Sequence, residues 1–295
     1  MKQHLLTALT LFSLNLGLFA QDQTNPTKQG WNTDGVFTIL MNQSAFSNWV
    51  AGGENNFAAN LNLNYNFNFY QGNFAWENKL LGSYGFTKNQ QSAYTKKTDD
   101  QLNYLSVMSL RGDTGKHFSF MTNFKTQFYK GYTYYTGDDG NEYRDLNTKF
   151  FSPAYLMFGP GLLIESVKNL SLNISPANAK FTFVSKDFTS QPGYVDGSYF
   201  GVDAFKGSRF ELGFNTTATY KVTLMENVTM ENLLTLYSNY LEDPQNIDID
   251  YTMNIIMKIN KLLSTNFTFQ AIYDDNAFEG FQIREVFGLG LNASF

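Results

Sequence analysis

The segment from Phe57 to Phe69 alternates strictly between two kinds of side chain. Its odd positions hold apolar or aromatic groups, and its even positions include Asn60, Asn62, Asn64, Asn66 and Asn68. Because successive side chains of a β-strand point to opposite faces, this strand has one apolar face and one face of carboxamides. It is longer than a typical soluble strand of about five or six residues and long enough for a tilted membrane-spanning strand of about nine to eleven.

The same alternation recurs along the chain and predicts twelve strands. In the segment 247–259, for example, Ile249 and Tyr251 oppose Asp248 and Asp250. The predicted strands cover residues 35–43, 57–70, 74–86, 101–111, 117–129, 153–165, 169–184, 209–223, 228–241, 247–259, 264–274 and 282–295. Because the number is even, we expect both ends of the strand series to lie on the same side.

The connections between these segments alternate between short and long. The short ones cover 71–73, 112–116, 166–168, 224–227 and 260–263, and the longer ones cover 47–56, 88–100, 130–152, 185–208, 242–246 and 275–281. Short turns at one end and long loops at the other are typical of outer-membrane barrels. The sequence therefore predicts an all-β fold, a closed antiparallel up-and-down transmembrane β-barrel of about twelve strands. Its apolar face should meet lipid and its polar face should line the lumen.

Composition agrees with a membrane barrel and argues against other classes of protein. Charged residues make up 16% of the chain, below the usual quarter, and aromatic residues make up 17%. No internal stretch of about twenty residues is uniformly apolar, so no transmembrane helix is expected. The net charge of −5 and the lack of a basic run argue against nucleic-acid binding.

The N-terminal residues predict export. A single lysine precedes an apolar run from Leu5 to Phe19, and the small residue Ala20 follows it. This pattern is typical of a secretory signal peptide. The chain has no cysteine, so no disulfide framework is expected. We therefore expect a signal peptide at 1–20, a flexible periplasmic lead-in at 21–34 and an outer-membrane β-barrel at 35–295.

The C-terminal segment resembles an assembly signal. Leu289, Leu291 and Ala293 alternate with small or polar residues, and the sequence ends on Phe295 in the same apolar row. An aromatic C-terminus on an amphipathic strand resembles the signal by which barrel assembly machinery recognises its clients. The resemblance implies that this machinery is a partner.

The polar face of the predicted strands defines the candidate site. It carries charges of both signs, whereas a strongly ion-selective channel tends to show one sign. The candidate lumen-lining residues are Asn60, Asn62, Asn64, Asn66, Asn68, Glu77, Lys79, Lys125, Glu211, Lys221, Asp248, Asp250, Lys258 and Arg284. Such a face fits either a weakly selective aqueous lumen or a lumen filled by its own polar network. Strand number does not decide, since twelve lies between filled barrels of about eight strands and porins of about sixteen.

Residue counts argue against an enzyme and against a metal site. After the predicted signal peptide the only histidine is His117, which we expect to be an exposed residue near a short turn and not a catalytic group. A zinc site built from His and Cys is excluded by count. The loop Gly137–Glu142 gathers oxygen ligands that calcium favours, but its spacing is not that of an EF-hand and a solvated loop is preferred. We therefore expect no catalytic residue, no metal and no cofactor.

The loop before the asparagine strand carries a motif. It reads S-N-W-V-A-G-G-E-N, and its marker residues are Ser47, Asn48, Trp49, Gly52, Gly53, Glu54 and Asn55. The run resembles an uncharacterised outer-membrane β-barrel family of Bacteroidetes-type bacteria, a domain of unknown function. The resemblance implies the fold and is silent about activity. Two adjacent glycines suit a turn with positive φ, so a structural use is favoured over a ligand site at Trp49, Glu54 and Asn55.

These observations lead to two expectations about function. The first is a passive pore or small-solute channel in the cell outer membrane, because the inward face is hydrophilic. The second is a structural or accessory subunit of an envelope complex with a closed lumen, because the loops are long and no catalytic set is present. An outer-membrane hydrolase is disfavoured by the histidine count. The expected partners are outer-membrane lipid and, for the second function, a protein of that complex.

Overall fold

The computed structural model describes residues 28–295 except 48–49, 51–52, 113–114 and 261. In this part of the chain, twelve strands form a closed barrel in which every neighbouring pair is antiparallel. They are β1 (Gly30–Ser44), β2 (Asn56–Gln71), β3 (Phe74–Asn89), β4 (Lys96–Leu110), β5 (Lys116–Thr126), β8 (Ala154–Val167), β9 (Leu170–Phe183), β10 (Ser208–Met225), β11 (Val228–Asn239), β12 (Asp248–Lys258), β13 (Leu263–Asp274) and β14 (Phe278–Ser294). The predicted closed barrel is confirmed.

Each of the twelve predicted strands corresponds to a barrel strand, with ends shifted by a few residues. The shift is largest where β1 begins at Gly30 and β4 begins at Lys96, each five residues before the predicted start. The residues from Gly30 to Asp34 pair with Tyr70 to Asn66 on β2, so the expectation of a flexible lead-in is wrong for them. The predicted signal peptide at 1–20 and the segment 21–27 lie outside the described residues.

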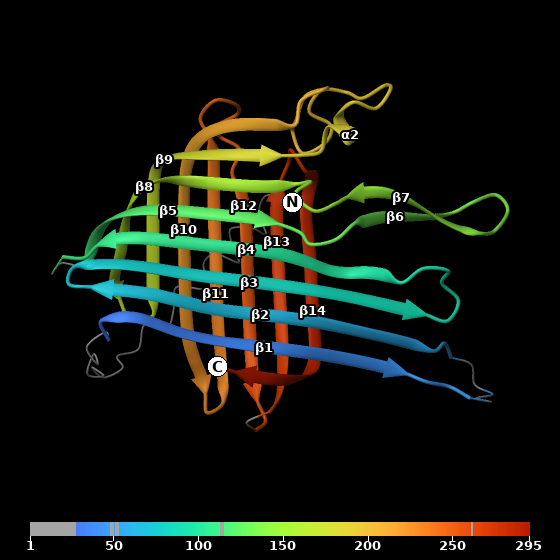
Figure 1. The fold of residues 1–295 in the computed structure, drawn as a ribbon, viewed down its shortest axis with the longest axis horizontal. Helices are drawn as coiled ribbons and strands as arrows, with labels where there is room; N and C mark the ends of the chain where they lie inside the picture. Colours follow the sequence, from blue (N-terminus) through green and yellow to red (C-terminus); the bar gives the residue numbers. More distant parts are fainter. Residues whose placement is uncertain (1–27, 48–49, 51–52, 113–114, 261) are drawn as a thin grey trace, which may run out of the picture.

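The two longest connections contain structure that the alternation does not predict. The loop after β5 holds a two-stranded hairpin of β6 (Gly131–Thr136) and β7 (Glu142–Thr148), and the loop after β9 holds the one-turn helix α2 (Lys186–Thr189). Figure 1 shows the hairpin projecting away from the barrel at the end of the long loops. No helix in the described part of the chain is long and apolar enough to cross a membrane.

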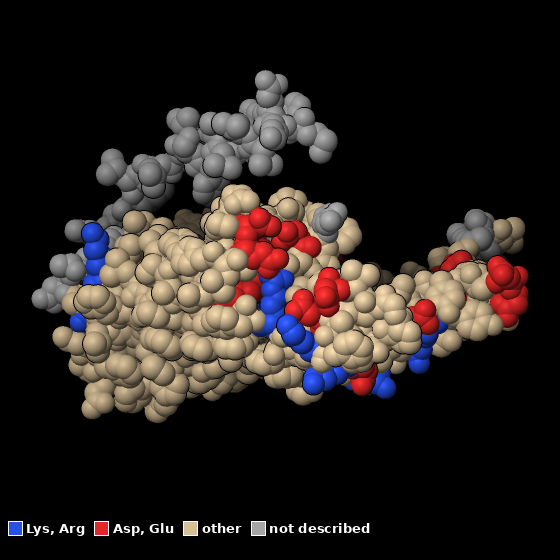
Figure 2. Space-filling view, turned by 90° about the horizontal axis from the view of Figure 1, so that it is seen from above, with Lys and Arg blue, Asp and Glu red and all other residues tan. Residues whose placement is uncertain are grey.

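The two faces of the barrel wall have opposite chemistry. Large apolar side chains are exposed on its outside, including Phe118 at 78% and Phe287 at 69% of their full exposure. Buried polar side chains such as Asn103, Asn123 and Asn215 face inward. Figure 2 shows a broad uncharged area of the barrel between basic side chains at one end and mixed charges at the other. The polarity of the two faces is therefore the reverse of that in a soluble protein, with apolar side chains outside and polar side chains inside.

Two asparagines interrupt the apolar outer face, and both are satisfied in the same way. Asn78 on β3 follows the outward Trp76, and its Oδ1 accepts a hydrogen bond from Tyr104 Oη at 2.7 Å. Asn232 on β11 accepts one from Tyr251 Oη, also at 2.7 Å. Because the tyrosine comes from the next strand in each case, a phenol ring covers the carboxamide and reduces its exposure on the apolar side.

Candidate functional site

The asparagine row lies on the inner face of β2, opposite polar or small groups of β3. Asn62 pairs in register with Ser83 and Asn66 with Lys79. Asn60 is buried and donates from Nδ2 to Asp99 Oδ2 of β4 at 3.0 Å. Asn66 donates to Asp34 of β1 at 2.8 Å, whereas the buried Oδ1 atoms of Asn60 and Asn64 have no hydrogen-bond partner among the described residues, so the row is only partly bonded.

Ion pairs cross the lumen between strands that are not neighbours. Lys79 of β3 binds Glu231 of β11, and Lys125 of β5 binds Asp250 of β12 at 2.5 Å between Nζ and Oδ2. A hydrogen bond between Thr217 of β10 and Met121 Sδ of β5, at 3.6 Å, joins the same two walls. Opposite walls of the barrel therefore touch through their side chains.

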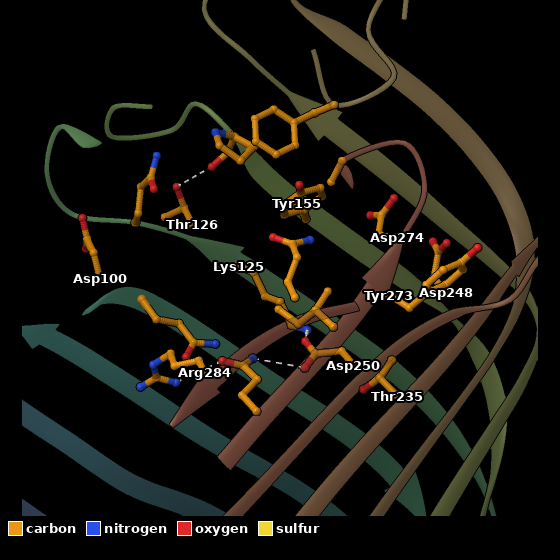
Figure 3. A pocket seen from close by; sticks show the side chains of 18 of the residues that line it. Asp100, Lys125, Thr126, Tyr155, Thr235, Asp248, Asp250, Tyr273, Asp274 and Arg284 are labelled. Atoms are coloured by element: carbon orange, nitrogen blue, oxygen red, sulfur yellow. Dashed lines mark hydrogen bonds and ion pairs between the residues drawn. The ribbon is translucent and has the colours of Figure 1, made fainter. Parts of the chain in front are cut away.

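A cavity of about 500 Å³ occupies the lumen at the long-loop end. Its walls are apolar and aromatic at Met157, Tyr155 and Phe200, and charged groups lie at its base. Figure 3 shows Lys125 and Asp250 together at one side of the cavity and Asp248 and Asp274 at another. The mixture of apolar walls and a few placed charges is that of a small-molecule site.

Below this cavity the described part of the lumen narrows sharply. Beside Lys125 and Met157 it leaves a separate void of about 10 Å³, close to the size of one water molecule. The Lys79–Glu231 pair belongs to the same polar interior. The barrel therefore has a cup at its long-loop end, above a constriction formed by its own side chains.

One corner of the cup gathers carboxylates around a single ammonium group. Lys180 Nζ lies 2.9 Å from Asp248, 3.2 Å from Glu211 and 3.9 Å from Asp274. Carboxylate oxygens of Asp248, Asp274 and Asp275 come within 4.8 Å of one another, which is close enough to hold a metal ion. Because Lys180 Nζ already neutralises part of this cluster, the carboxylates have a cation from the chain itself.

A second charged cluster, partly exposed, lies at the short-turn end of the lumen. Arg111 Nη2 binds Glu77 at 2.9 Å and lies 3.4 Å from Glu165, whose carboxylate is 3.6 Å from His117 Nε2. The expectation that His117 is exposed is wrong, because it is 5% exposed and its Nδ1 accepts from the backbone N–H of Gly112 at 3.0 Å. His117 is therefore part of an interior network of ion pairs, in which it contacts Glu165 and the backbone of Gly112.

The remaining candidate residues differ in how deeply they sit. Glu211 is buried between Lys180 and Arg209. Lys221 is exposed and lies opposite Glu231 in the β10–β11 register, while Lys258 is exposed at the end of β12. Arg284 binds Asp99 across the cup at 2.6 Å. The alternation did not select Asp99, because it falls in the predicted connection 88–100. It did not select Tyr237 either, because the segment 228–241 has apolar residues on both faces.

The motif loop is only partly visible. Asn48, Trp49 and Gly52 lie outside the described residues. Asn55 Oδ1 accepts from the backbone N–H of Phe46 at 2.6 Å, and its Nδ2 donates to Gln90. Gly53 has a φ of +150°, and a Cβ there would lie 2.9 Å from the Phe46 ring. Asn55 and Gly53 thus fix the turn between β1 and β2, while Ser47 and Glu54 lie exposed in it.

The acidic loop considered for calcium forms the turn of the β6–β7 hairpin. Asp139 accepts hydrogen bonds from Tyr143 Oη at 2.7 Å and from Asn141, and these bonds lower the pKa of its carboxyl. Glu142 binds Lys96 Nζ at 2.5 Å, and this contact lowers its pKa. The Asp139 carboxylate therefore stabilises the turn of the hairpin, and the Glu142 carboxylate joins the hairpin to β4.

Comparisons with known proteins find a family and a fold resemblance. A model of a family described as a protein of unknown function matches residues 41–132, which include the motif loop and the asparagine row. A search of curated proteins finds no match. Among solved structures, the translocator domain of the autotransporter NalP from Neisseria meningitidis is 8% identical with a TM-score of 0.42, and covers 100% of this chain and 95% of that chain.

Two channels are similar at the same level. An outer membrane channel from Pseudomonas putida F1 is 11% identical with a TM-score of 0.40, covering 93% of this chain and 99% of that one. The Pseudomonas putida toluene transporter TodX is 8% identical with a TM-score of 0.37, covering 90% and 87%.

Proposed function

We propose that the chain is an integral outer-membrane β-barrel that takes up a small solute into its outer cup and passes it through a lumen closed at rest by ion pairs. The exposed apolar outer face and the polar interior support a bilayer as the surrounding solvent. The observation that carries the proposal is the 500 Å³ cavity above the Lys125–Asp250 pair.

This proposal refines the expectation of a passive pore. A constantly open pore needs a continuous bore, whereas the described lumen contains the crossing pair Lys79–Glu231 and a void of about one water molecule. Conduction then requires the crossing side chains to move apart. The mixed signs of the inward charges favour weak ion preference once the path is open.

Conductance in planar bilayers tests the proposal. We expect the wild-type protein to give rare or no steps, and a variant with Lys79→Ala, Glu231→Ala, Lys125→Ala and Asp250→Ala to give frequent ones. The matched control removes the exposed loop pair with Asp203→Ala and Lys206→Ala, which should leave conductance unchanged. A permanently open wild type, or a folded but silent quadruple variant, contradicts a lumen closed by these pairs. Heat-dependent gel mobility checks folding.

A specific observation favours the second function, an accessory subunit of an envelope complex. The β6–β7 hairpin projects from the barrel and exposes Tyr135, Tyr143 and Leu146. Exposed aromatic groups on a rigid projection suit a protein interface. A stoichiometric partner that co-purifies with the wild type and is lost after replacement of 131–148 by a short turn would support this function.

A further inference from the structure

The seam that closes the barrel is much shorter than its neighbours. Strands β1 and β14 pair only from Val36↔Ser294 to Leu40↔Gly290, continued by two backbone hydrogen bonds between Gly35 and Phe295. By contrast, β1 pairs with β2 along its whole length, from Gly30↔Tyr70 to Ser44↔Asn56. In Figure 1, β14 runs beside β1 near its C-terminal end and then turns away. The barrel is therefore closed at the short-turn end and parted above Leu40.

The unpaired edge of β14 lies at the level of the apolar outer band. Above the seam, Phe281, Ile283 and Phe287 point outward and are exposed. On the proposed function, this stretch lies within the bilayer. Unpaired backbone groups are costly in hydrocarbon and are tolerated at membrane depth where they border protein or a water-filled cavity. The unpaired backbone groups of β14 therefore require a polar or water-filled space beside them.

The cup provides that space. Gln282 and Arg284 on the inner face of β14 line the cavity, and on the other side of the gap its lining continues with Asp99 and Gln101 of β4. Strands β1, β2 and β3 contribute none of the described lining residues, and β1 is no longer paired with β14 above Leu40. Gln282 and Arg284 therefore belong both to the lining of the cup and to the stretch of β14 that is not paired with β1.

A small set of polar contacts spans the gap. Arg284 Nη2 of β14 binds Asp99 Oδ2 of β4 at 2.6 Å, and the same oxygen accepts from Asn60 Nδ2 of β2 at 3.0 Å. Below them, the Leu40 side chain packs where Cβ atoms at Gly288 and Gly290 would lie, at 3.3 Å and 2.8 Å. The Arg284–Asp99–Asn60 contact therefore acts as a latch above a tightly packed seam.

We propose that the gap between β1 and β14 is a lateral door through which a small amphipathic molecule moves between the cup and the bilayer, with Arg284–Asp99 as its latch. This inference rests on the proposed function and names its substrate class. The cup offers apolar groups such as Met157 and Ile272 beside Lys125 and Asp250, which suits a molecule with a hydrocarbon body and a polar head. A molecule that partitions into lipid reaches this door without crossing the ion pairs below.

Fluorescence quenching by lipid tests the door. The chain has no cysteine, so a single cysteine labelled with bimane reports one position. Three sites on the full-length protein are compared in vesicles of phosphatidylcholine brominated in its acyl chains. Gln282→Cys reports the inner face beside the gap, Ile283→Cys the outer face and Thr235→Cys the far wall of the cup.

We expect strong quenching at 283, weak quenching at 235 and intermediate quenching at 282. Opening the latch with Asp99→Asn should at least double the quenching at 282, whereas the matched change Asp250→Asn in the deeper pair should not. Equal protection at 282 and 235 in all variants overturns the door while leaving the proposed function standing. Absence of quenching at 283 overturns the proposed function as well, because the barrel then lies outside the bilayer.

A probe of the proposed class completes the test. Dodecyl phosphocholine brominated in its chain, added to unbrominated vesicles, should quench a label at 235 more strongly in the Asp99→Asn variant than in the Asp250→Asn variant. Equal quenching in both variants contradicts entry past the latch. A Glu285→Cys variant that forms intermolecular disulfides in the membrane also overturns the door, since a second copy of the chain would then cover the free edge of β14.

Discussion

Removing either partner of the Lys79–Glu231 pair should cost measurable stability, and the two losses should be unequal. Both side chains are 18% exposed, so they are largely withdrawn from water. Breaking a fully buried pair costs about 3–5 kcal/mol, because the remaining charge is left without compensation. For this partly exposed pair we expect about 2–3 kcal/mol from Glu231→Gln, which deprives Lys79 of the one carboxylate bonded to it in the described chain.

The reverse change should be milder. After Lys79→Met, Glu231 still faces Lys221 in the β10–β11 register, so we expect a loss of about 1–2 kcal/mol. The variant with both changes should be more stable than the sum of the two losses indicates, with a coupling of about 1–2 kcal/mol. The exposed pair Lys206–Asp203 serves as the control, with an expected coupling below about 0.5 kcal/mol.

Urea unfolding in lipid vesicles, followed by tryptophan fluorescence and heat-dependent gel mobility, provides the free energies. The reasoning is refuted if the Lys79–Glu231 coupling equals that of the control pair. It is also refuted if Lys79→Met costs more than Glu231→Gln, because the order of the two losses follows directly from the position of Lys221.

Three further expectations follow from local geometry. Gly159→Ala should destabilise the barrel by about 1–3 kcal/mol, because its Cβ would lie 2.4 Å from the carbonyl oxygen of Ala177, whereas Gly112→Ala, which meets nothing within 4 Å, should change the unfolding midpoint little. Tyr104→Phe should cost about 1 kcal/mol by leaving Asn78 Oδ1 without its phenol donor, and Tyr251→Phe should repeat the effect at Asn232; no change in the unfolding free energy would show that these bonds contribute nothing. The lowered pKa values of Asp139 and Glu142 stabilise the β6–β7 hairpin above their ordinary values of 3.8 and 4.5, and this contribution is lost as the pH falls below them. The protection of amides in 131–148, measured against their intrinsic exchange rate at each pH, should therefore fall in acid, and Asp139→Asn should weaken that dependence.

The alternation of the sequence predicted the barrel because two solvents act on the two faces of each strand. In β2, phenylalanine and leucine on one face and asparagine on the other leave a single register that satisfies both. The hairpin β6–β7 escaped prediction because its short strands are polar on both faces. Arg144 of β7 lies 4.1 Å from the Tyr132 ring of β6 and 4.5 Å from the ring of Tyr94 in the connection before β4.

The candidate site was less predictable than the fold. Periodicity selected the inward carboxylates and amines, since position along a strand decides which face a residue occupies. It did not select their partners, because Lys125 meets Asp250 only through the curvature of the whole sheet. Periodicity did not predict the divergence of β1 from β14 either, since it reports the face that a residue occupies and not the strand with which it pairs.

The contact between opposite walls separates two quantities that are often taken together, the number of strands and the width of the passage. Lys79, Lys125 and Met121 contact side chains of the opposite wall. The free cross-section of the lumen therefore depends on these side chains and not on the number of strands alone. Inserting one more hairpin would lengthen the circumference without removing a crossing residue. The permeability of such a barrel can therefore change by substitution of a few side chains, while its strand number stays the same.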